Sequence, residues 1–189
     1  MKRRARFTGN EKTVKADPVL GRTILRAPLP SDEAIFTTLA QRSRRLHAPW
    51  TLAPSTPKAF AAYLEQMESP ANRCFLVCLK DSAHGDEQIA GAFHISQIAM
   101  GNFCSAYLGY YVFAGYERRG VMRAGLQQLI RHAFGAMKLH RLEANIQVGN
   151  TASIALVKAC GFNQEGFSPR YLKINGRWRD HERWALVAR

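Results

Sequence analysis

The C-terminal half of the chain switches repeatedly between two hydrophobic periods. Residues 106–113 form an aromatic-rich run that predicts a strand, and residues 118–137 carry apolar side chains at the spacing of a buried helix. Residues 142–148 predict another strand, and residues 150–160 predict a short helix. This alternation favours a mixed α/β sheet with helices on both faces.

The remaining segments supply further helices and strands. Ser31 is placed to cap a helix over residues 34–46, and a second helix is expected after a proline-rich loop, over residues 57–67. Strands are expected at residues 21–27, 74–79, 89–96, 167–174 and 181–188. A polar turn at residues 81–86 and the strong turn signal Asn175-Gly176 join four of these strands in pairs.

Length and composition favour one domain with a hydrophobic core. The chain has 189 residues, of which 47% are hydrophobic and 22% charged, an ordinary globular balance. Residues 1–19 are polar and basic without periodicity, so we expect a mobile tail followed by a single domain over residues 20–189. No apolar run approaches the length of a membrane span, and none follows the basic start. The expected compartment is therefore the cytoplasm.

The four cysteines do not suggest a metal site. Cys74, Cys78, Cys104 and Cys160 form no Cys-x-x-Cys pair, and no histidine pair has zinc-finger spacing, so no metal is expected. Cys74 and Cys78 are four residues apart in an expected strand and therefore share one face. Small core side chains are the simplest interpretation, with a redox or metal role as the alternative.

Charge narrows the choice of partner. With 27 Lys and Arg against 14 Asp and Glu, the formal net charge is +13. This value favours an anionic partner such as nucleic acid, a ribonucleoprotein surface or a phosphate-rich cofactor. The sequence contains no uniform basic helix and no Arg-Gly repeat, so charge alone does not choose among these partners.

A strand that runs through a basic turn into a helix is the first candidate site. Arg118, Arg119 and Gly120 occupy the turn, and Arg123 lies in the first helical turn. Free backbone N–H groups and the positive end of the helix dipole bind phosphate at such a position. The segment matches neither a Walker P-loop nor a dinucleotide fingerprint, and an ordinary strand–helix turn with solvated arginines is the alternative.

A second strand–helix junction carries two polar side chains. Asn150 is placed to cap the short helix and Ser153 lies in its first turn, and each residue alone has an ordinary structural explanation. Together with the first junction they form a set of motifs that resembles the GNAT acetyltransferases over about residues 21–188. The motifs are Ala106-Tyr-Leu-Gly-Tyr110, Arg119-Gly-Val-Met122, His140-Arg-Leu-Glu143, Asn150-Thr-Ala-Ser153, Gly161-Phe162 and Tyr171-Leu-Lys-Ile-Asn-Gly-Arg-Trp-Arg-Asp-His181.

Within that family the chain is most similar to bacterial enzymes that acetylate the N-termini of ribosomal proteins, of the S5-alanine type. The resemblance implies a GNAT fold, with a mixed and mostly antiparallel central sheet and helices on both faces, and acetyl-CoA as co-substrate. It also implies that the strand over residues 108–113 splays away from its neighbour and holds the pantetheine arm and thioester. The cofactor-binding residues implied in this way are Tyr111, Val112, Phe113, Arg118, Arg119, Gly120, Val121, Met122, Arg123, Asn150 and Ser153.

Three positions depart from the family pattern. Glu117 stands where Gln or Arg is usual, and its charge is unfavourable beside a pyrophosphate unless the side chain points away. Met122 replaces the usual Gly or Ala, as in the S5 type. Many relatives place a tyrosine general acid where Val157 stands, so the acid is either absent or supplied by Ser153.

The expected chemistry is direct attack of a neutral amine on the acetyl thioester in a ternary complex. A backbone N–H near Val112 would stabilise the oxyanion. An α-amine, with a pKa of roughly 7.7–8.0, suits a site without an obvious strong base better than a lysine at about 10.4. Glu143 is the candidate base, with a structural carboxylate as the alternative, and Ser153 and Asn150 complete the candidate catalytic set.

Three aromatic residues are candidates for acceptor recognition. Trp50 follows the first expected helix in a proline-rich loop, a position that suits recognition or core anchoring equally. Tyr107 and Tyr110 are placed to shape an acceptor pocket, with packing within the sheet as the alternative. Asp180 and His181, in the closing hairpin, are expected to be structural.

These observations predict an N-acetyltransferase that modifies the N-terminal α-amine of a ribosomal protein. The expected partner is that protein or the ribosomal particle, with rRNA contacted through the basic surface, and the expected state is a monomer or homodimer without membrane contact. Two alternatives are open. One is an acetyltransferase for a small amine, although a polycation would favour an acidic pocket. The other is a ribosome- or RNA-binding assembly factor with vestigial activity.

Overall fold

The computed structural model describes residues 19, 22–80 and 87–189. The tail expected over residues 1–19 lies outside the described residues except for Val19, and so does the turn expected over residues 81–86. None of the helices in these ranges is long and apolar enough to span a bilayer.

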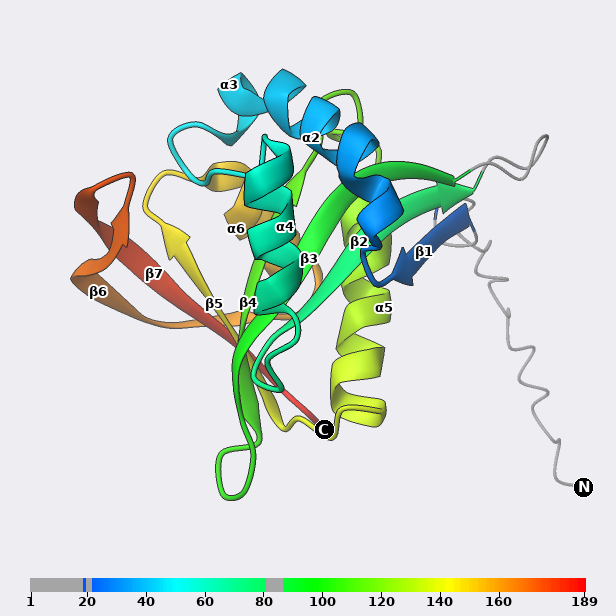
Figure 1. Cartoon of the computed structure of the whole chain (residues 1–189). Helices are drawn as coiled ribbons and strands as arrows, with labels where there is room; N and C mark the ends of the chain where they lie inside the picture. Colours follow the sequence, from blue (N-terminus) through cyan, green and yellow to red (C-terminus); the bar gives the residue numbers. More distant parts are fainter. Residues whose placement is uncertain (1–18, 20–21, 81–86) are drawn as a thin grey trace, which may run out of the picture.

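The described residues form one seven-stranded sheet with the order β1-β2-β3-β4-β5-β7-β6 (Figure 1). Neighbouring strands are antiparallel except β4 and β5, which are parallel. The predicted mixed, mostly antiparallel sheet is therefore confirmed. The strands are β1 Thr23–Arg26, β2 Arg73–Lys80, β3 Glu87–Ala99, β4 Ser105–Val112, β5 Arg141–Gln147, β6 Asn163–Ile174 and β7 Arg177–Val187.

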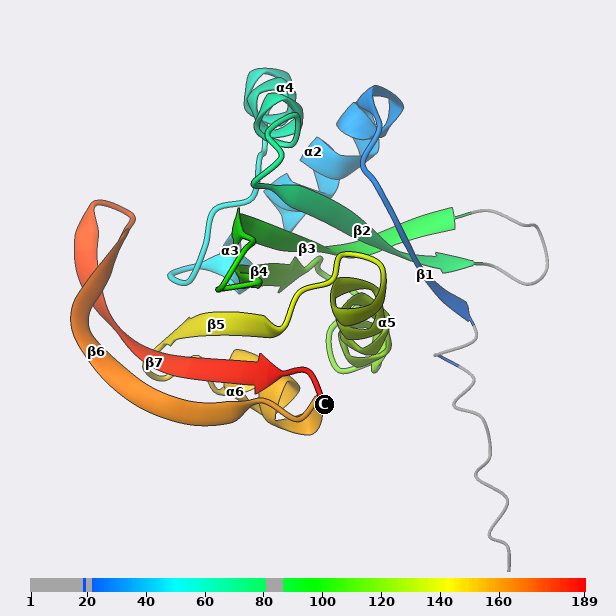
Figure 2. The same ribbon diagram turned by 90° about the horizontal axis from the view of Figure 1, so that it is seen from below.

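Helices cover both faces of the sheet, as predicted (Figure 2). On one face lie α2 (Glu33–Arg42), α3 (Arg44–His47) and α4 (Pro57–Gln66); on the other lie α5 (Val121–Gly135) and α6 (Thr151–Ala159). Each face has its own buried apolar cluster. The sheet thus separates two cores, which we call the α4 side and the α5 side.

In strand β2, successive side chains point to opposite faces and so contribute alternately to the two cores. Cys74, Leu76 and Cys78 pack on the α4 side, whereas Val77 and Leu79 pack on the α5 side. The prediction that the two cysteines share a face as small core residues is confirmed, because both are buried and unpaired.

The expected helix over residues 34–46 differs from the structure at both ends. Ser31 is not its cap, because a 3₁₀ turn (Pro30–Asp32) precedes the helix and the Asp32 carboxylate accepts the Leu29 N–H at 2.7 Å. At the other end the helix stops at Ser43, whose buried hydroxyl donates to the Leu39 carbonyl and accepts the Ala114 N–H. These bonds tie the break between α2 and α3 to the end of β4.

The closing hairpin forms as predicted. Asn175 and Gly176 both have positive φ values, 49° and 77°, as a tight two-residue hairpin turn requires. Asp180 accepts the Arg170 N–H across the hairpin at 2.7 Å, and His181 is buried, so both residues have the expected structural role.

Candidate active site

A gap opens in the centre of the sheet between β4 and β5. The two strands pair only from Ser105 to Tyr107, opposite Arg141 to Glu143. Beyond Tyr107, β4 continues to Val112 on its pairing with β3 alone. Strand β4 therefore splays away from β5, as the resemblance implied, and its second half has no strand partner on the side of β5.

The backbone groups that face this gap follow from strand geometry. Phe113 donates its N–H to Ala90 in β3, so the N–H groups of Tyr110 and Val112 point the other way, toward the gap. His47 in α3 contacts the Val112 carbonyl oxygen through Nε2 at 2.8 Å. Because a carbonyl only accepts, Nε2 carries the proton. Burial lowers the pKa of His47, which favours the neutral ring.

The helix α5 begins at the end of β4 with an open N-terminus. Its N-cap is Gly120, whose φ of 76° lies in the left-handed region that favours glycine. The first helical hydrogen bond runs from the Ala124 N–H to the Gly120 carbonyl, so the preceding N–H groups have no partner within the helix. Arg118 and Arg123 flank this end and are exposed.

Two side chains of the turn point back into the turn itself. The Glu117 carboxylate accepts the Gly115 N–H at 2.6 Å, which commits one of its oxygens to the backbone. The Arg119 guanidinium lies 5.4 Å from the Tyr116 ring and donates to the Gly115 carbonyl at 3.2 Å. Arg119 is thus held against the turn by these contacts, and Arg118 and Arg123 are exposed.

Several of the expected cofactor-binding residues have side chains that are packed in the two cores. Phe113 and Tyr111 are buried on the α4 side and Val121 on the α5 side. Met122 packs against Gly91. A Cβ added to Gly91 would lie 2.7 Å from the Met122 sulfur and 2.6 Å from the Tyr111 carbonyl oxygen, so this contact requires glycine. For these four residues, any contribution to acetyl-CoA binding comes from the backbone.

The short helix α6 closes the gap on the α5 side. Asn150 caps this helix by accepting the Ser153 N–H through its side-chain oxygen at 3.2 Å. Tyr110 donates its hydroxyl proton to the Ser153 carbonyl oxygen at 3.0 Å, which joins the splayed half of β4 to α6. Val157 is fully buried, so this position has neither an acidic proton nor access to the gap.

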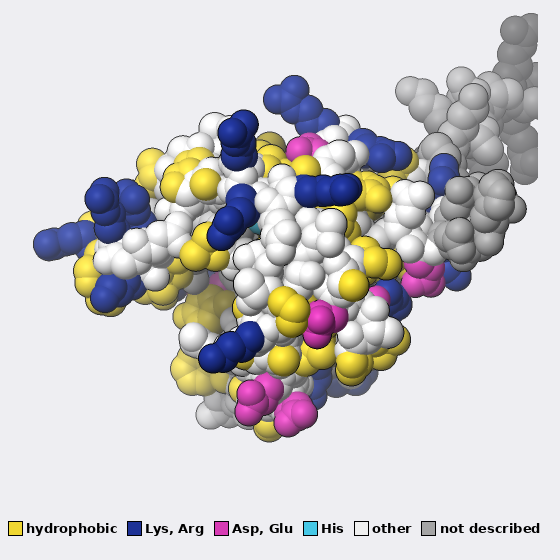
Figure 3. All heavy atoms as spheres, turned by 45° about the horizontal axis from the view of Figure 1, so that its top comes forward, with side chains coloured by type: hydrophobic (Ala, Val, Ile, Leu, Met, Phe, Trp, Pro, Cys, Tyr) yellow, Lys and Arg dark blue, Asp and Glu magenta, His cyan; other side chains and the backbone are white. Residues whose placement is uncertain are grey.

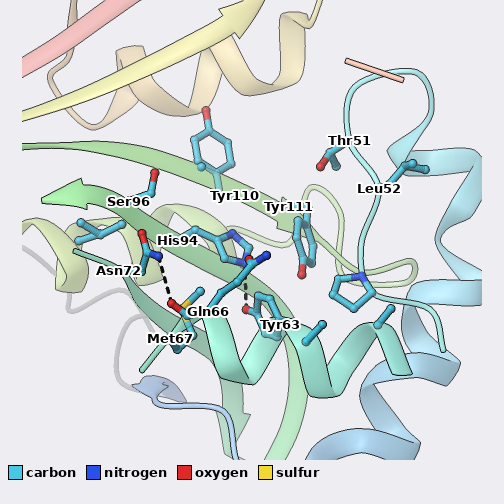
Figure 4. A pocket seen from close by; sticks show the side chains of 15 residues that line it. Thr51, Leu52, Tyr63, Gln66, Met67, Asn72, His94, Ser96, Tyr110 and Tyr111 are labelled. Atoms are coloured by element: carbon cyan, nitrogen blue, oxygen red, sulfur yellow. Dashed lines mark hydrogen bonds between the residues drawn. The ribbon is translucent and has the colours of Figure 1, made fainter. Parts of the chain in front are cut away.

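The α4 side of the splayed strand borders a cavity of about 500 Å³ (Figure 4). Its walls come from β3, β4, α4 and the loop after Trp50, and no Asp, Glu, Lys or Arg is among the fifteen residues that line it. The lining residues are Thr51, Leu52, Pro54, Ala59, Ala62, Tyr63, Gln66, Met67, Asn72, His94, Ile95, Ser96, Gly109, Tyr110 and Tyr111.

His94 and Tyr63 are titratable groups in the wall of this cavity that sequence reasoning missed. The His94 Nε2 lies 2.8 Å from the Tyr63 hydroxyl, which also contacts the Cys74 sulfur. Burial lowers the pKa of His94 to about 4, so the ring is neutral at pH 7. Burial raises the pKa of Cys74 to about 12 and that of Tyr63 as well, so both stay protonated. The cavity is therefore uncharged, with polar groups set among apolar lining residues.

The acceptor residues predicted from the sequence lie on different sides of the sheet. The Tyr110 ring points toward α6, away from His94 and Tyr63, so it borders the cavity without projecting into it (Figure 4). Tyr111, which had been assigned to the thioester, presents its ring to the cavity instead, 5.4 Å from the His94 ring. Tyr107 lies where β4 still pairs with β5, next to Glu143.

Glu143 is engaged by two arginines. Its carboxylate accepts from Arg141 at 2.8 Å and lies 3.4 Å from Arg183. Its side chain is only 16% exposed. Both carboxylate oxygens are thus engaged by guanidinium groups, which favours the structural alternative over a general base.

Trp50 anchors the loop that covers the cavity. Its carbonyl oxygen accepts a hydrogen bond from Gln147 at the end of β5. Its ring packs near Gly149, 3.8 Å from the position that a Cβ on this glycine would occupy. The ring is half-buried. Trp50 thus fixes the loop across the end of β5, and Thr51 and Leu52 from that loop reach the cavity.

His47, Tyr63 and His94 had no sequence signal because they come from separate elements and share no motif. Only His47, beside the singled-out Trp50, lay near a predicted site. Among residues 19, 22–80 and 87–189, no group of three or more His, Cys, Asp or Glu side chains is placed to hold a metal ion.

Comparison with known proteins agrees with this geometry. The sequence profile of the acetyltransferase (GNAT) domain matches residues 22–163. Over 102 residues the chain is 31% identical to a probable N-acetyltransferase, YjcK, of Bacillus subtilis, covering 54% of this chain and 56% of the relative. It is 35% identical to the [ribosomal protein uS5]-alanine N-acetyltransferase of Escherichia coli, covering 54% and 53%. The matches thus span about half the length of these curated relatives.

One solved structure extends the similarity over most of the fold. The chain superposes on Mycobacterium smegmatis RimJ in complex with CoA-disulfide with a TM-score of 0.79 at 26% sequence identity. The match covers 88% of this chain and 82% of the other.

Proposed function

Because the chain belongs to the GNAT acetyltransferase family, we propose that it transfers the acetyl group of acetyl-CoA to the N-terminal α-amine of a protein, with a ribosomal protein as the acceptor. One observation carries the choice of acceptor. The cavity on the α4 side has no charged lining residue and meets the splayed strand at Gly109, Tyr110 and Tyr111. A neutral amine fits such a cavity, whereas a polyamine needs carboxylates.

The described residues fit acetyl-CoA as the co-substrate. The unpaired edge of β4 offers N–H and C=O groups for an extended, amide-containing arm, as an open sheet edge does for a peptide. The open N-terminus of α5, with Arg118 and Arg123 beside it, suits a pyrophosphate. When bound, acetyl-CoA supplies an activated acetyl thioester.

The chain's own residues then act mainly by positioning. We assign the Val112 N–H, which faces the gap, to the carbonyl oxygen of the acetyl group. His47 holds the same residue through its carbonyl and so fixes the direction of that N–H. His94 has a ring nitrogen without a hydrogen-bond partner in the described part of the chain, and we assign it to orient the acceptor.

Proton transfer in this proposal needs no strong base. An α-amine with a pKa of roughly 7.7–8.0 is partly neutral at pH 7 and enters an uncharged cavity in that form. As its nitrogen bonds to the acetyl carbon and the carbon–sulfur bond breaks, the nitrogen loses one proton and the sulfur gains one. Ser153, in the first turn of α6, stays the candidate for delivering that proton, and Asn150 positions it through the helix cap.

The test is acetyl transfer to synthetic acceptors read by mass spectrometry. The purified protein would receive acetyl-CoA with peptides that begin with Ala, Ser or Met, with a peptide whose N-terminus is blocked and which carries a lysine, and with spermidine. We expect acetylation of free α-amines and none of the blocked peptide or spermidine.

Each other outcome contradicts a different part of the proposal. Transfer to spermidine alone would replace the protein acceptor with a small amine. Acetyl-CoA binding without transfer to any acceptor would favour an assembly factor that has lost the reaction.

A further inference from the structure

The end of the β6–β7 hairpin projects beyond the rest of the sheet (Figure 2). Pairing between β5 and β7 ends at Gln147 and His181. Past that pair, residues 172–174 pair with residues 177–179 and with no other described strand. We call residues 170–179 the basic ribbon, because they form the two-stranded, mostly exposed end of this hairpin.

The basic ribbon carries positive charge without compensation. It contains four cations, Arg170, Lys173, Arg177 and Arg179, and no Asp or Glu. Within the described part of the chain, none of the four lies within ion-pair distance of a carboxylate. Figure 3 shows Lys and Arg side chains projecting around this end of the molecule, with hydrophobic side chains between them. Such a cluster attracts a polyanion.

An exposed tryptophan lies among these cations. Trp178 is 60% exposed and pairs across the ribbon with Lys173. Burial in the core does not account for this side chain, in contrast to Trp184, which is 3% exposed. A large flat ring between cations is the arrangement on which an unpaired nucleotide base stacks while its phosphates contact Lys and Arg.

The basic ribbon is held in place by bonds that do not involve its cationic side chains. Asn175 at the turn donates its side-chain N–H to the Pro49 carbonyl at 3.1 Å, beside the Trp50 loop. Asp180 accepts the Arg170 backbone N–H at the base. The backbone that carries the cations and Trp178 is thus already held in position, which reduces the conformational entropy that the ribbon loses when it binds a ligand.

From this combination we propose that the basic ribbon is a binding site for single-stranded RNA, with Trp178 stacking on a base and the four cations contacting phosphates. The choice of RNA over DNA rests on the proposed function, since a ribosomal protein acceptor is presented beside RNA. The ribbon would then hold the enzyme next to its acceptor. An acidic protein is the competing partner, and the test separates it.

The experiment measures binding of the full chain to fluorescently labelled single-stranded RNA of roughly 16 nucleotides by anisotropy, without acetyl-CoA. We expect Trp178→Ala to weaken binding roughly 5- to 100-fold, and Phe103→Ala, which removes another exposed ring, to have no effect. Arg177→Ala should weaken binding several-fold and lower the salt slope by about one, whereas Arg131→Ala on α5 should not.

Several results would overturn this proposal. If Arg177→Ala and Arg131→Ala weaken RNA binding equally, the binding depends on net charge and not on the basic ribbon. If Trp178→Ala binds RNA as tightly as the native protein, base stacking on Trp178 is excluded. Tighter binding of single-stranded DNA of the same sequence, or equal competition by polyglutamate, would exclude RNA as the partner. Acetylation of a free peptide, measured on the same variants without RNA, reports the proposed function separately and is expected to be unchanged.

Discussion

At the scale of the residue, the buried histidines link the fold to its chemistry. His47 and His94 both lie near the Tyr111 ring, at centroid distances of 5.0 and 5.4 Å. Each has a pKa below the ordinary value because burial disfavours the charged ring. The protein therefore keeps hydrogen-bonding groups beside the splayed strand without adding charge to the cavity.

The pKa of His94 makes a prediction about stability. An unfolded histidine titrates near 6.5, whereas in the folded chain the pKa of His94 is about 4. Between these values the unfolded chain binds the extra proton, so the stabilisation is complete above pH 6.5 and is lost as the pH falls toward 4. The contribution of His94 to the free energy of unfolding should fall by about 2 kcal/mol between pH 7.5 and pH 5.

Urea denaturation of the native protein and of His94→Gln at these two pH values measures this contribution. The variant cannot titrate at this position, so its stability should depend less steeply on pH. His47 and His181, whose pKa values are also lowered by burial, contribute the same slope to both proteins and cancel in the comparison. Parallel pH dependences would mean that His94 does not carry the effect.

At the scale of the element, the start of α5 depends on one glycine conformation. Gly120 has a φ of 76°, and a Cβ there would meet no atom within 4 Å, so a substitution strains the backbone without a steric clash. Gly120→Ala should cost about 1–2 kcal/mol of stability and weaken acetyl-CoA binding, because the N–H groups of the helix start would shift. Thermal unfolding and calorimetric titration measure the two effects.

Gly135→Ala is the matched control within the same helix. Gly135 also has open space around its Cβ position but no positive φ, so alanine should be neutral or stabilise by about 0.4–1 kcal/mol. A similar loss in both variants would show that α5 is merely sensitive to substitution.

Individual helices and the closing hairpin were largely predictable from the sequence, whereas the contacts between separate elements were not. Local patterns predicted α4, α5, α6 and the closing hairpin, because periodicity, Asn150 and Asn175-Gly176 act over a few residues. The Ser31 cap was wrong because Asp32 is held by Arg26, a partner in another element, at 2.8 Å. The same limit explains the site: the resemblance implied the splayed strand, whereas His94 and Tyr63 meet only in the folded sheet.

At the scale of the whole molecule, the sheet separates the two regions that we propose for acetyl-CoA and for the acceptor, and these regions meet at the gap. The open N-terminus of α5 and the cap of α6 lie on the α5 side, and the uncharged cavity lies on the α4 side. A small perturbation on one side should therefore leave equilibrium binding on the other side unchanged. Gly109 and Arg123 allow the two regions to be altered one at a time.

Gly109 lies in the cavity wall, where a Cβ would make ordinary contact with His94 at 4.0 Å and a longer side chain would enter the cavity. Gly109→Leu should raise the KM for an acceptor peptide roughly tenfold or more while leaving the Kd for acetyl-CoA unchanged.

Arg123→Ala should do the reverse, weakening acetyl-CoA binding roughly tenfold with little change in peptide KM. Steady-state kinetics with varied peptide and calorimetry with acetyl-CoA report the two quantities separately. If Gly109→Leu weakens acetyl-CoA as much as it weakens the peptide, the cavity belongs to the co-substrate and the division of the sheet into two binding faces is wrong.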